Sequence, residues 1–362
     1  MAYTAVPNPK NTALNSVRYD GNSSTQTITG VNFNPDLTII KNYVGTTESW
    51  SWFDKCRGAT KWLATQSDGA QTTTADTLTS WNSDGFALGA SDQVNGTSGR
   101  KYVSWNFKGG GDGVTNSVGD TDSLVSVNTA SGFSVVTWTG TGSNTTVGHG
   151  LGAVPKWILT KRTDAGSSDW ELFPTVFGGT GNTFIKVNGT GAEYSSSTYM
   201  NATDPTTTVF SLGTDTSWNA SGGTYVAYCF APVKGFSWFP NQVGGNASSD
   251  GYFYYTGFRP QIVIIKGNHG SYATNWYWYG SNNQGHGNPV DSGLYNNVSS
   301  IGFTDSSSVQ IKMFANGFKV AGASDDINNS GTWKLSAAFA AQPTISTDGL
   351  SANAFGSDVN EG

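Results

Sequence analysis

Charged side chains are scarce in this chain of 362 residues. Asp, Glu, Lys and Arg together make up only 12% of it, and the net charge is -6. The few basic residues are scattered along the sequence, whereas nucleic-acid-binding proteins cluster Lys and Arg to neutralise phosphates. The composition therefore argues against nucleic acid as a partner.

Cysteine, histidine and glutamate are also rare. Two distant cysteines form no disulfide framework or metal-spaced set and are predicted to be buried small hydrophobes. The three histidines occupy separate glycine-rich turns, which predicts solvated loop residues: His149, His269 and His286. Among the four glutamates only Glu171 has an informative acidic neighbour, Asp169, and a solvated strand edge explains this pair. We therefore expect no enzyme, no cofactor and no metal; a calcium site using acidic turns such as "SDGF" stays an alternative.

Long apolar runs are absent. No window approaches 18 consecutive apolar residues, and the N-terminal stretch "MAYTAVPNPKNTALNSV" lacks the basic and apolar regions of a secretory signal. We expect neither membrane insertion nor secretion by a cleaved signal peptide.

Glycine and aromatic residues are abundant instead. The chain has 47 glycines, and 13% of its residues are aromatic. Glycine and asparagine suit turns, while aromatic and β-branched residues suit a pleated surface. The sequence thus predicts many short strands and no long helices.

Four sequence elements recur three times in the same order. The first is a period-2 strand opened by a proline and closed by a lysine: "NPDLTIIK", "VPKWILTK" and "RPQIVIIK". It is followed by "SWSWFD", "DWELFP" or "NWYWYG", then by strands carrying Phe86, Phe210 and Phe318, and last by strands ending at Phe107, Phe230 and Phe339. The prolines Pro35, Pro155 and Pro260 are spaced by 120 and then 105 residues, which suits small β domains.

This repetition predicts an all-β fold of three tandem antiparallel β-sandwich units of the jelly-roll or lectin type. We place the units at residues 16–118, 122–237 and 245–342, with an N-terminal arm (1–15) and a C-terminal tail (343–362) outside them.

The stretch "NWYWYG" places four aromatic residues in a row. Alignment of the three copies puts Trp276 and Trp278 on the buried face, whereas the slot between them holds Ser51, Glu171 or Tyr277 and tolerates a charge. We therefore expect Tyr277 to face solvent and Tyr279 to pack under a loop or against a neighbouring unit. With His286 in the following loop, these two tyrosines are our candidates for a ligand or interface site.

The polar surface rich in aromatic, Asn, Ser and Thr residues leaves two interpretations open. Sugars stack on Tyr or Trp and bind amide and hydroxyl groups, and repeated weak sites add up through avidity. Alternatively, the repeats form a scaffold whose units bind only each other.

Several long motifs resemble a repeat domain of virion-surface and tail-associated proteins of marine tailed bacteriophages. The matching stretches are "PDLTIIKN", "FDKCRGATKWL", "DTLTSWNSDGFALG", "YVSWNFKGGG", "GFSVVTWTGTGSNTTVGHGLGAVPKWILTKR", "TYVAYCFAPVKGF" and "YTGFRPQIVIIK".

The resemblance implies a structural virion protein, assembled in the host cytoplasm beside other virion proteins. Its first expected role is a tail fibre or tail-tip component in host attachment, through a host surface glycan. The alternatives are a capsid decoration protein and a polysaccharide-degrading tail enzyme. The resemblance to fibres favours a homotrimer, although no heptad repeat is present to impose one.

Overall fold

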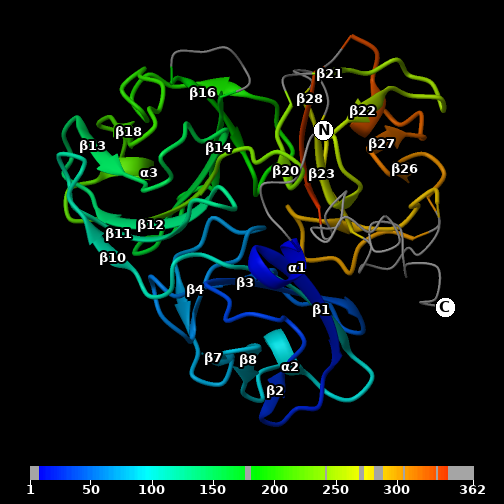
Figure 1. The fold of residues 1–362 in the computed structure, drawn as a ribbon, viewed down its shortest axis with the longest axis horizontal. Helices are drawn as coiled ribbons and strands as arrows, with labels where there is room; N and C mark the ends of the chain where they lie inside the picture. The colour runs from blue at the N-terminus through cyan, green and yellow to red at the C-terminus, as the bar shows by residue number, and fades with distance from the viewer. Residues whose placement is uncertain are drawn as a thin grey trace.

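The computed structural model describes residues 8–175, 181–240, 243–268, 273–280, 288–304, 306–331 and 333–340. Strands take 43% of the described residues and helices only 5%, in antiparallel sheets without a barrel. The predicted all-β fold of three sandwich units is confirmed. The units form a triangle, with the first (blue to cyan) below, the second (green) at upper left and the third (yellow to red) at upper right (Figure 1).

The first unit spans residues 14–107. Its inner sheet has the strand order β1 (Leu14–Asp20), β9 (Lys101–Phe107), β3 (Leu37–Val44) and β4 (Ser51–Asp54). The outer sheet has the order β2 (Gln26–Ile28), β8 (Gly85–Leu88) and β7 (Leu78–Asn82). Helix α1 (Pro9–Thr12) precedes these sheets, and β5 (Lys61–Trp62) pairs with β6 (Thr72–Thr73) beside them.

The second unit spans residues 114–230 and has the widest inner sheet. Its order is β10 (Val114–Asn116), β11 (Ser123–Asn128), β12 (Phe133–Thr139), β19 (Thr224–Phe230), β14 (Trp157–Arg162), β15 (Glu171–Pro174), β16 (Thr183–Lys186) and β17 (Tyr194–Ser195). The outer sheet pairs β13 (Thr145–Gly148) with β18 (Val209–Leu212).

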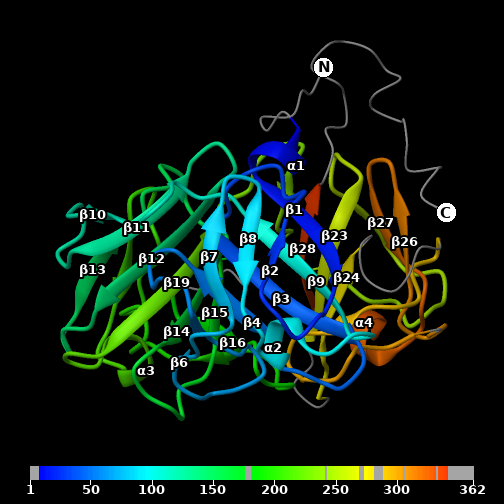
Figure 2. The ribbon, with the colours of Figure 1, turned by 90° about the horizontal axis from the view of Figure 1, so that it is seen from below.

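The third unit spans residues 237–340. Its inner sheet runs β20 (Ser237–Trp238), β28 (Trp333–Ala340), β23 (Pro260–Asn268), β24 (Trp276–Gly280) and β25 (Leu294–Tyr295), and β21 (Val243–Gly244) also pairs with β28. The outer sheet runs β22 (Phe253–Tyr255), β27 (Gly317–Val320) and β26 (Ile311–Phe314). Figure 2 shows the three units from the side.

Strand registers repeat from unit to unit. The residue two positions after each repeat proline pairs with the phenylalanine of the last element: Leu37 with Phe107, Trp157 with Phe230, and Ile262 with Phe339. The sequence repeat is therefore a structural repeat down to the pairing of single residues.

Each unit also contains one short helix: α2 (Asp92–Asn95), α3 (Thr216–Asn219) and α4 (Asp325–Asn328). Each helix ends in a buried asparagine whose amide donates to a carbonyl six residues earlier: Asn95 to Gly89, Asn219 to Gly213 and Asn328 to Gly322. These amides hold the turn after the third element, because a buried amide needs hydrogen-bond partners.

The central strands of the inner sheets are buried on both faces. In β3, Ile40 packs into the core of the first sandwich, whereas Leu37 and Ile39 belong to a cluster shared by all three units. The side chains of β14 are split between two cores in the same way, with Ile158 inside its own sandwich and Trp157 in the shared cluster. A strand reads as nearly continuous apolar sequence when both of its faces are covered.

Contacts between the units close a ring. The indole of Trp50 in the first unit donates to the Tyr295 carbonyl in the third at 2.9 Å. The indole of Trp170 in the second unit donates to the Ala64 carbonyl in the first at 2.8 Å. The indole of Trp276 in the third unit completes the ring by donating to the Lys186 carbonyl in the second at 3.0 Å. The arrangement is thus a pseudo-trimer within one chain.

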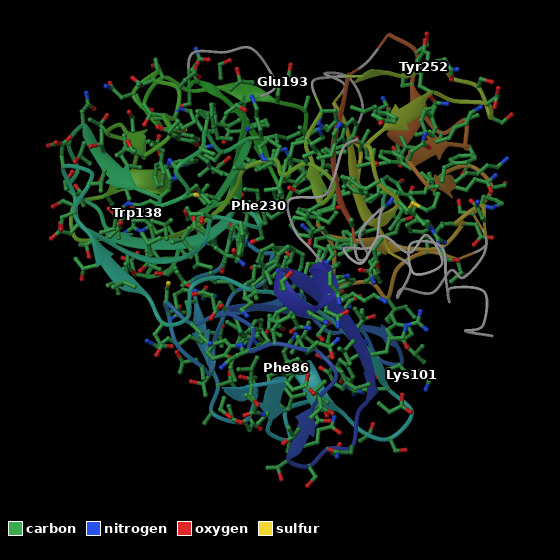
Figure 3. All side chains as sticks on the ribbon, in the orientation of Figure 1. Phe86, Lys101, Trp138, Glu193, Phe230 and Tyr252 are labelled. Carbon is green, nitrogen blue, oxygen red and sulfur yellow. The ribbon has the colours of Figure 1, made fainter. Side chains whose placement is uncertain are left out.

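One phenylalanine from each unit meets the other two. The ring centroids of Phe107, Phe230 and Phe339 are 5.7 to 5.9 Å apart in all three pairs, with edge-on geometry. Edge-to-face contact is a favoured arrangement of aromatic rings. Phe230 lies toward the middle of the molecule in Figure 3, where the units converge.

Candidate functional site

The expectation that Tyr277 faces solvent is wrong. Its side chain is only 2% exposed, and its hydroxyl donates to the Asp326 carboxylate. The reason is that β24 is covered on both faces: Tyr277 packs inside the third sandwich, while Trp276 and Trp278 face the other units. The predicted burial of those two tryptophans, 1% and 3% exposed, is confirmed.

The other two candidate residues do not extend a surface site. Tyr279 is fully buried beside Tyr277, with the ring centroids 6.2 Å apart, and its hydroxyl donates to the Val309 carbonyl. His286 and His269 lie outside the described residues. His149 is not a solvated loop residue as expected: it is buried, and its Nδ1 accepts from the Leu151 amide at 3.2 Å.

The slot of Tyr277 is buried in the other units too. Ser51 is fully buried and Glu171 is 2% exposed, so tolerance of a charge did not indicate solvent. A polar partner explains each case, because a buried polar group is tolerated when it is hydrogen-bonded. Ser51 accepts from the amide of Gln93 at 2.7 Å, and Glu171 accepts from the hydroxyl of Tyr194.

Glu171 is the most perturbed carboxyl group of the described chain. Burial raises its pKa to about 7, against the lowering effect of the Tyr194 hydrogen bond and the Lys186 charge. Its neighbour Asp169 is engaged separately, with Lys186 at 2.5 Å and the Asn188 amide at 2.8 Å. Each of the two carboxylates thus has its own internal partners.

Two of the three repeat lysines, Lys161 and Lys266, are buried where two units meet. The Lys161 ammonium donates to the Ser168 carbonyl in its own unit at 2.6 Å and to the backbone carbonyl of Asp68 in the first unit at 3.1 Å. The Lys266 ammonium donates to the backbone carbonyl of Thr190 in the second unit at 2.8 Å. Burial lowers the pKa of Lys161 to about 8 and that of Lys266 to about 7.

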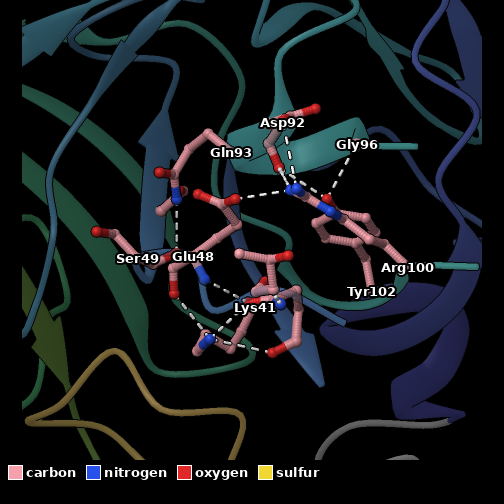
Figure 4. A network of polar contacts seen from close by, with 11 residues as sticks. Lys41, Glu48, Ser49, Asp92, Gln93, Gly96, Arg100 and Tyr102 are labelled. Carbon is pink, nitrogen blue, oxygen red and sulfur yellow. Dashed lines mark hydrogen bonds and ion pairs between the residues drawn. The ribbon is translucent and has the colours of Figure 1, made fainter. Parts of the chain in front are cut away.

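The third repeat lysine, Lys41, lies in the network of Figure 4. Its ammonium donates to the Asn42 side chain at 2.7 Å and to the Glu48 carbonyl at 2.8 Å, and burial lowers its pKa to about 7. The Glu48 carboxylate in turn pairs with Arg100 at 2.7 Å. These lysines join strand ends to loops and have a structural role.

A groove of about 500 Å³ opens between the first and second units. Its floor is the part of the second inner sheet that extends past the shared core. Thr115, Leu124 and Thr137 lie side by side across β10, β11 and β12. Further along, Thr139 pairs with Thr224. The floor is therefore rich in hydroxyl groups around one half-exposed leucine.

The first unit supplies the wall of this groove. Arg57 donates to the Asp54 carboxylate at 2.6 Å, to the Trp52 carbonyl at 2.8 Å and to the Gln71 side-chain oxygen at 3.1 Å. The Gln71 backbone amide donates to the Thr163 carbonyl of the second unit at 2.9 Å. Wall and floor are thus bonded to each other, which makes the groove preformed.

Sequence reasoning missed this groove. The strand β10, Lys61 and Gln71 all lie outside the four repeated elements from which the units were recognised. The one available signal was the alternation of "FSVVTWT", which places Thr137 and Thr139 on the same face of β12.

The exposed aromatic residues of the third unit also differ from the expected ones. Tyr252, Phe253 and Tyr255 are 48%, 43% and 65% exposed. They lie on or beside β22, an edge strand of the outer sheet, and Tyr252 is at the outer rim of the molecule in Figure 3. The stretch "GYFYYTGF" thus contributes an edge strand of the outer sheet, β22.

Two further properties concern the described residues only. No group of three or more His, Cys, Asp or Glu side chains among them has the proximity of a metal site. None of the helices described is long and apolar enough to span a membrane.

A family model described as a domain of unknown function (DUF7483) matches residues 10–343. The chain belongs to this family. One match covers all three units, so the DUF7483 domain corresponds to the whole pseudo-trimer and not to a single sandwich. No curated protein matches the chain, and no solved structure does.

Proposed function

We propose that this chain is a structural protein of a tailed-phage virion, a tail fibre or tail-tip component that contributes to host attachment. The observation that carries the proposal is the ring of contacts through which each unit donates a tryptophan N–H to the next. A body whose three units share one aromatic core suits a rigid building block that presents surface loops. The resemblance of the chain's sequence motifs to phage virion proteins supports the assignment to a virion.

The test is the location of the protein in particles of a phage that encodes it. Gold-labelled antibody against the full chain should decorate the tail of intact particles, and the purified chain should compete with particles for adsorption to host cells. Labelling over the capsid would instead favour the decoration role. Absence of the chain from purified particles would contradict the proposal.

A catalytic role is separated by a second measurement. The purified chain is incubated with host envelope glycans, and reducing ends are counted over time. A binding protein produces no new reducing ends, whereas sustained release would favour a polysaccharide-degrading tail enzyme.

A further inference from the structure

We propose that the groove between the first and second units binds a short oligosaccharide. This inference rests on the proposed attachment role, because it names the site and the ligand class through which a host surface would be recognised. The volume of the groove, about 500 Å³, lies in the range of small-molecule binding pockets.

The groove offers hydrogen-bonding groups that have no partner within the described chain. They are the hydroxyls of Thr115, Thr137 and Thr139, the ammonium of Lys61 and the carboxylate of Asp122. Hydroxyl groups both donate and accept, as sugar hydroxyls do. A polyhydroxylated ligand can therefore satisfy this mixed set of groups.

Arg57 acts as a positioning residue for the wall. Because it donates to the side-chain oxygen of Gln71, that amide keeps its NH₂ group as the free donor. Arg57 itself is occupied by Asp54 and by backbone oxygen, with a side chain 5% exposed. It is therefore not available to neutralise an anionic ligand.

Shape and charge favour a sugar over a polyanion. Leu124 is 41% exposed in the centre of the hydroxyl row and provides an apolar surface for the C–H face of a sugar ring. The lining contains the basic residue Lys61 and the acidic residue Asp122, whose charges have opposite sign. A nucleic acid or polyphosphate needs an excess of positive charge that this groove does not offer.

The experiment uses the full chain and an array of defined di- to hexasaccharides of neutral hexoses, N-acetylhexosamines and uronic acids. Sugars that bind are measured again by isothermal titration calorimetry. Thr137→Val keeps the shape of the floor and removes one hydroxyl, so affinity should fall about three- to tenfold. Leu124→Lys places a long side chain across the floor and should weaken binding by at least about tenfold.

Matched controls lie outside the groove. Thr27→Val changes an exposed threonine of β2, and Val118→Lys changes an exposed residue in the turn after β10. Both controls should bind as the wild type does, and all four variants should keep the wild-type melting temperature within a few degrees.

Two results would overturn the groove as a glycan site: no sugar on the array binds the wild type, or the groove variants bind as tightly as the controls. Neither result affects the location of the chain in the particle, so failure of this inference is distinguishable from failure of the proposed function.

Discussion

At the scale of single residues, the sandwich interiors contain polar groups that are matched in pairs. In each second element, the residue between the two that face the other units points into the sandwich and is Ser51, Glu171 or Tyr277. Ser51 and Tyr277 each bond the second residue of their own unit's short helix, Gln93 or Asp326. The second unit departs from this pattern, because Glu171 on β15 is bonded by Tyr194 of β17, two strands away in the same sheet.

Glu171 gives a pH-dependent prediction. Burial raises its pKa to about 7 from an ordinary value of 4.5, so the folded protein holds this proton more tightly than the unfolded chain. The resulting stabilisation is fully present below pH 4.5 and is lost as the pH rises through 7, by roughly 3 kcal/mol. Glu171→Gln keeps an acceptor for Tyr194 and removes the titration. Urea unfolding from pH 4.5 to 7.5 should show the wild type losing free energy of unfolding relative to the variant; parallel curves would refute the assignment.

At the scale of elements, alternation along a strand identifies its two faces but not what covers each face. The repeat correctly placed Trp276 and Trp278 together on one buried face of their strand. It could not show that this face packs against other units, because a strand covered on both sides lacks the polar alternation that marks a solvated face. Tyr277 was assigned to solvent because the equivalent position in the second unit is the charged residue Glu171, which is in fact buried. The repeated asparagine of the short helices was a further sequence signal of buried polar contacts.

The corrected position of Tyr277 predicts a large effect on stability. Tyr277→Ala removes a ring that contacts Tyr295 and Phe303, and it leaves Asp326 without its hydroxyl donor, so it should cost about 3 to 5 kcal/mol. Tyr252→Ala is the matched control, since that ring is 48% exposed and its loss should cost less than about 0.5 kcal/mol. Chemical denaturation of both variants checks this. Equal, small effects would show that Tyr277 is not packed in the third sandwich.

At the scale of the whole molecule, the three units depend on each other. Each inner sheet presents aromatic side chains to the shared core, among them Trp105, Tyr228 and Phe339. An isolated unit would expose this surface to water, and exposed apolar patches of this kind drive association. The sequence repeat predicted three similar domains; their cyclic packing depends on contacts between segments far apart in the chain, which no local pattern records.

The phenylalanine triad tests this dependence. Phe230→Ala removes the ring that touches Phe107 of the first unit and Phe339 of the third, at an expected cost of about 3 to 5 kcal/mol. Native-state hydrogen exchange should then show faster exchange in β9, β19 and β28 together, because all three strands border the cavity. Phe86→Ala is the matched control: Phe86 is also buried, but it lies inside the first sandwich alone, so its effect on exchange should be centred on β2, β7 and β8. If Phe230→Ala loosened only the second unit, the three sandwiches would be independent domains joined by linkers, and the shared core would not couple their stability.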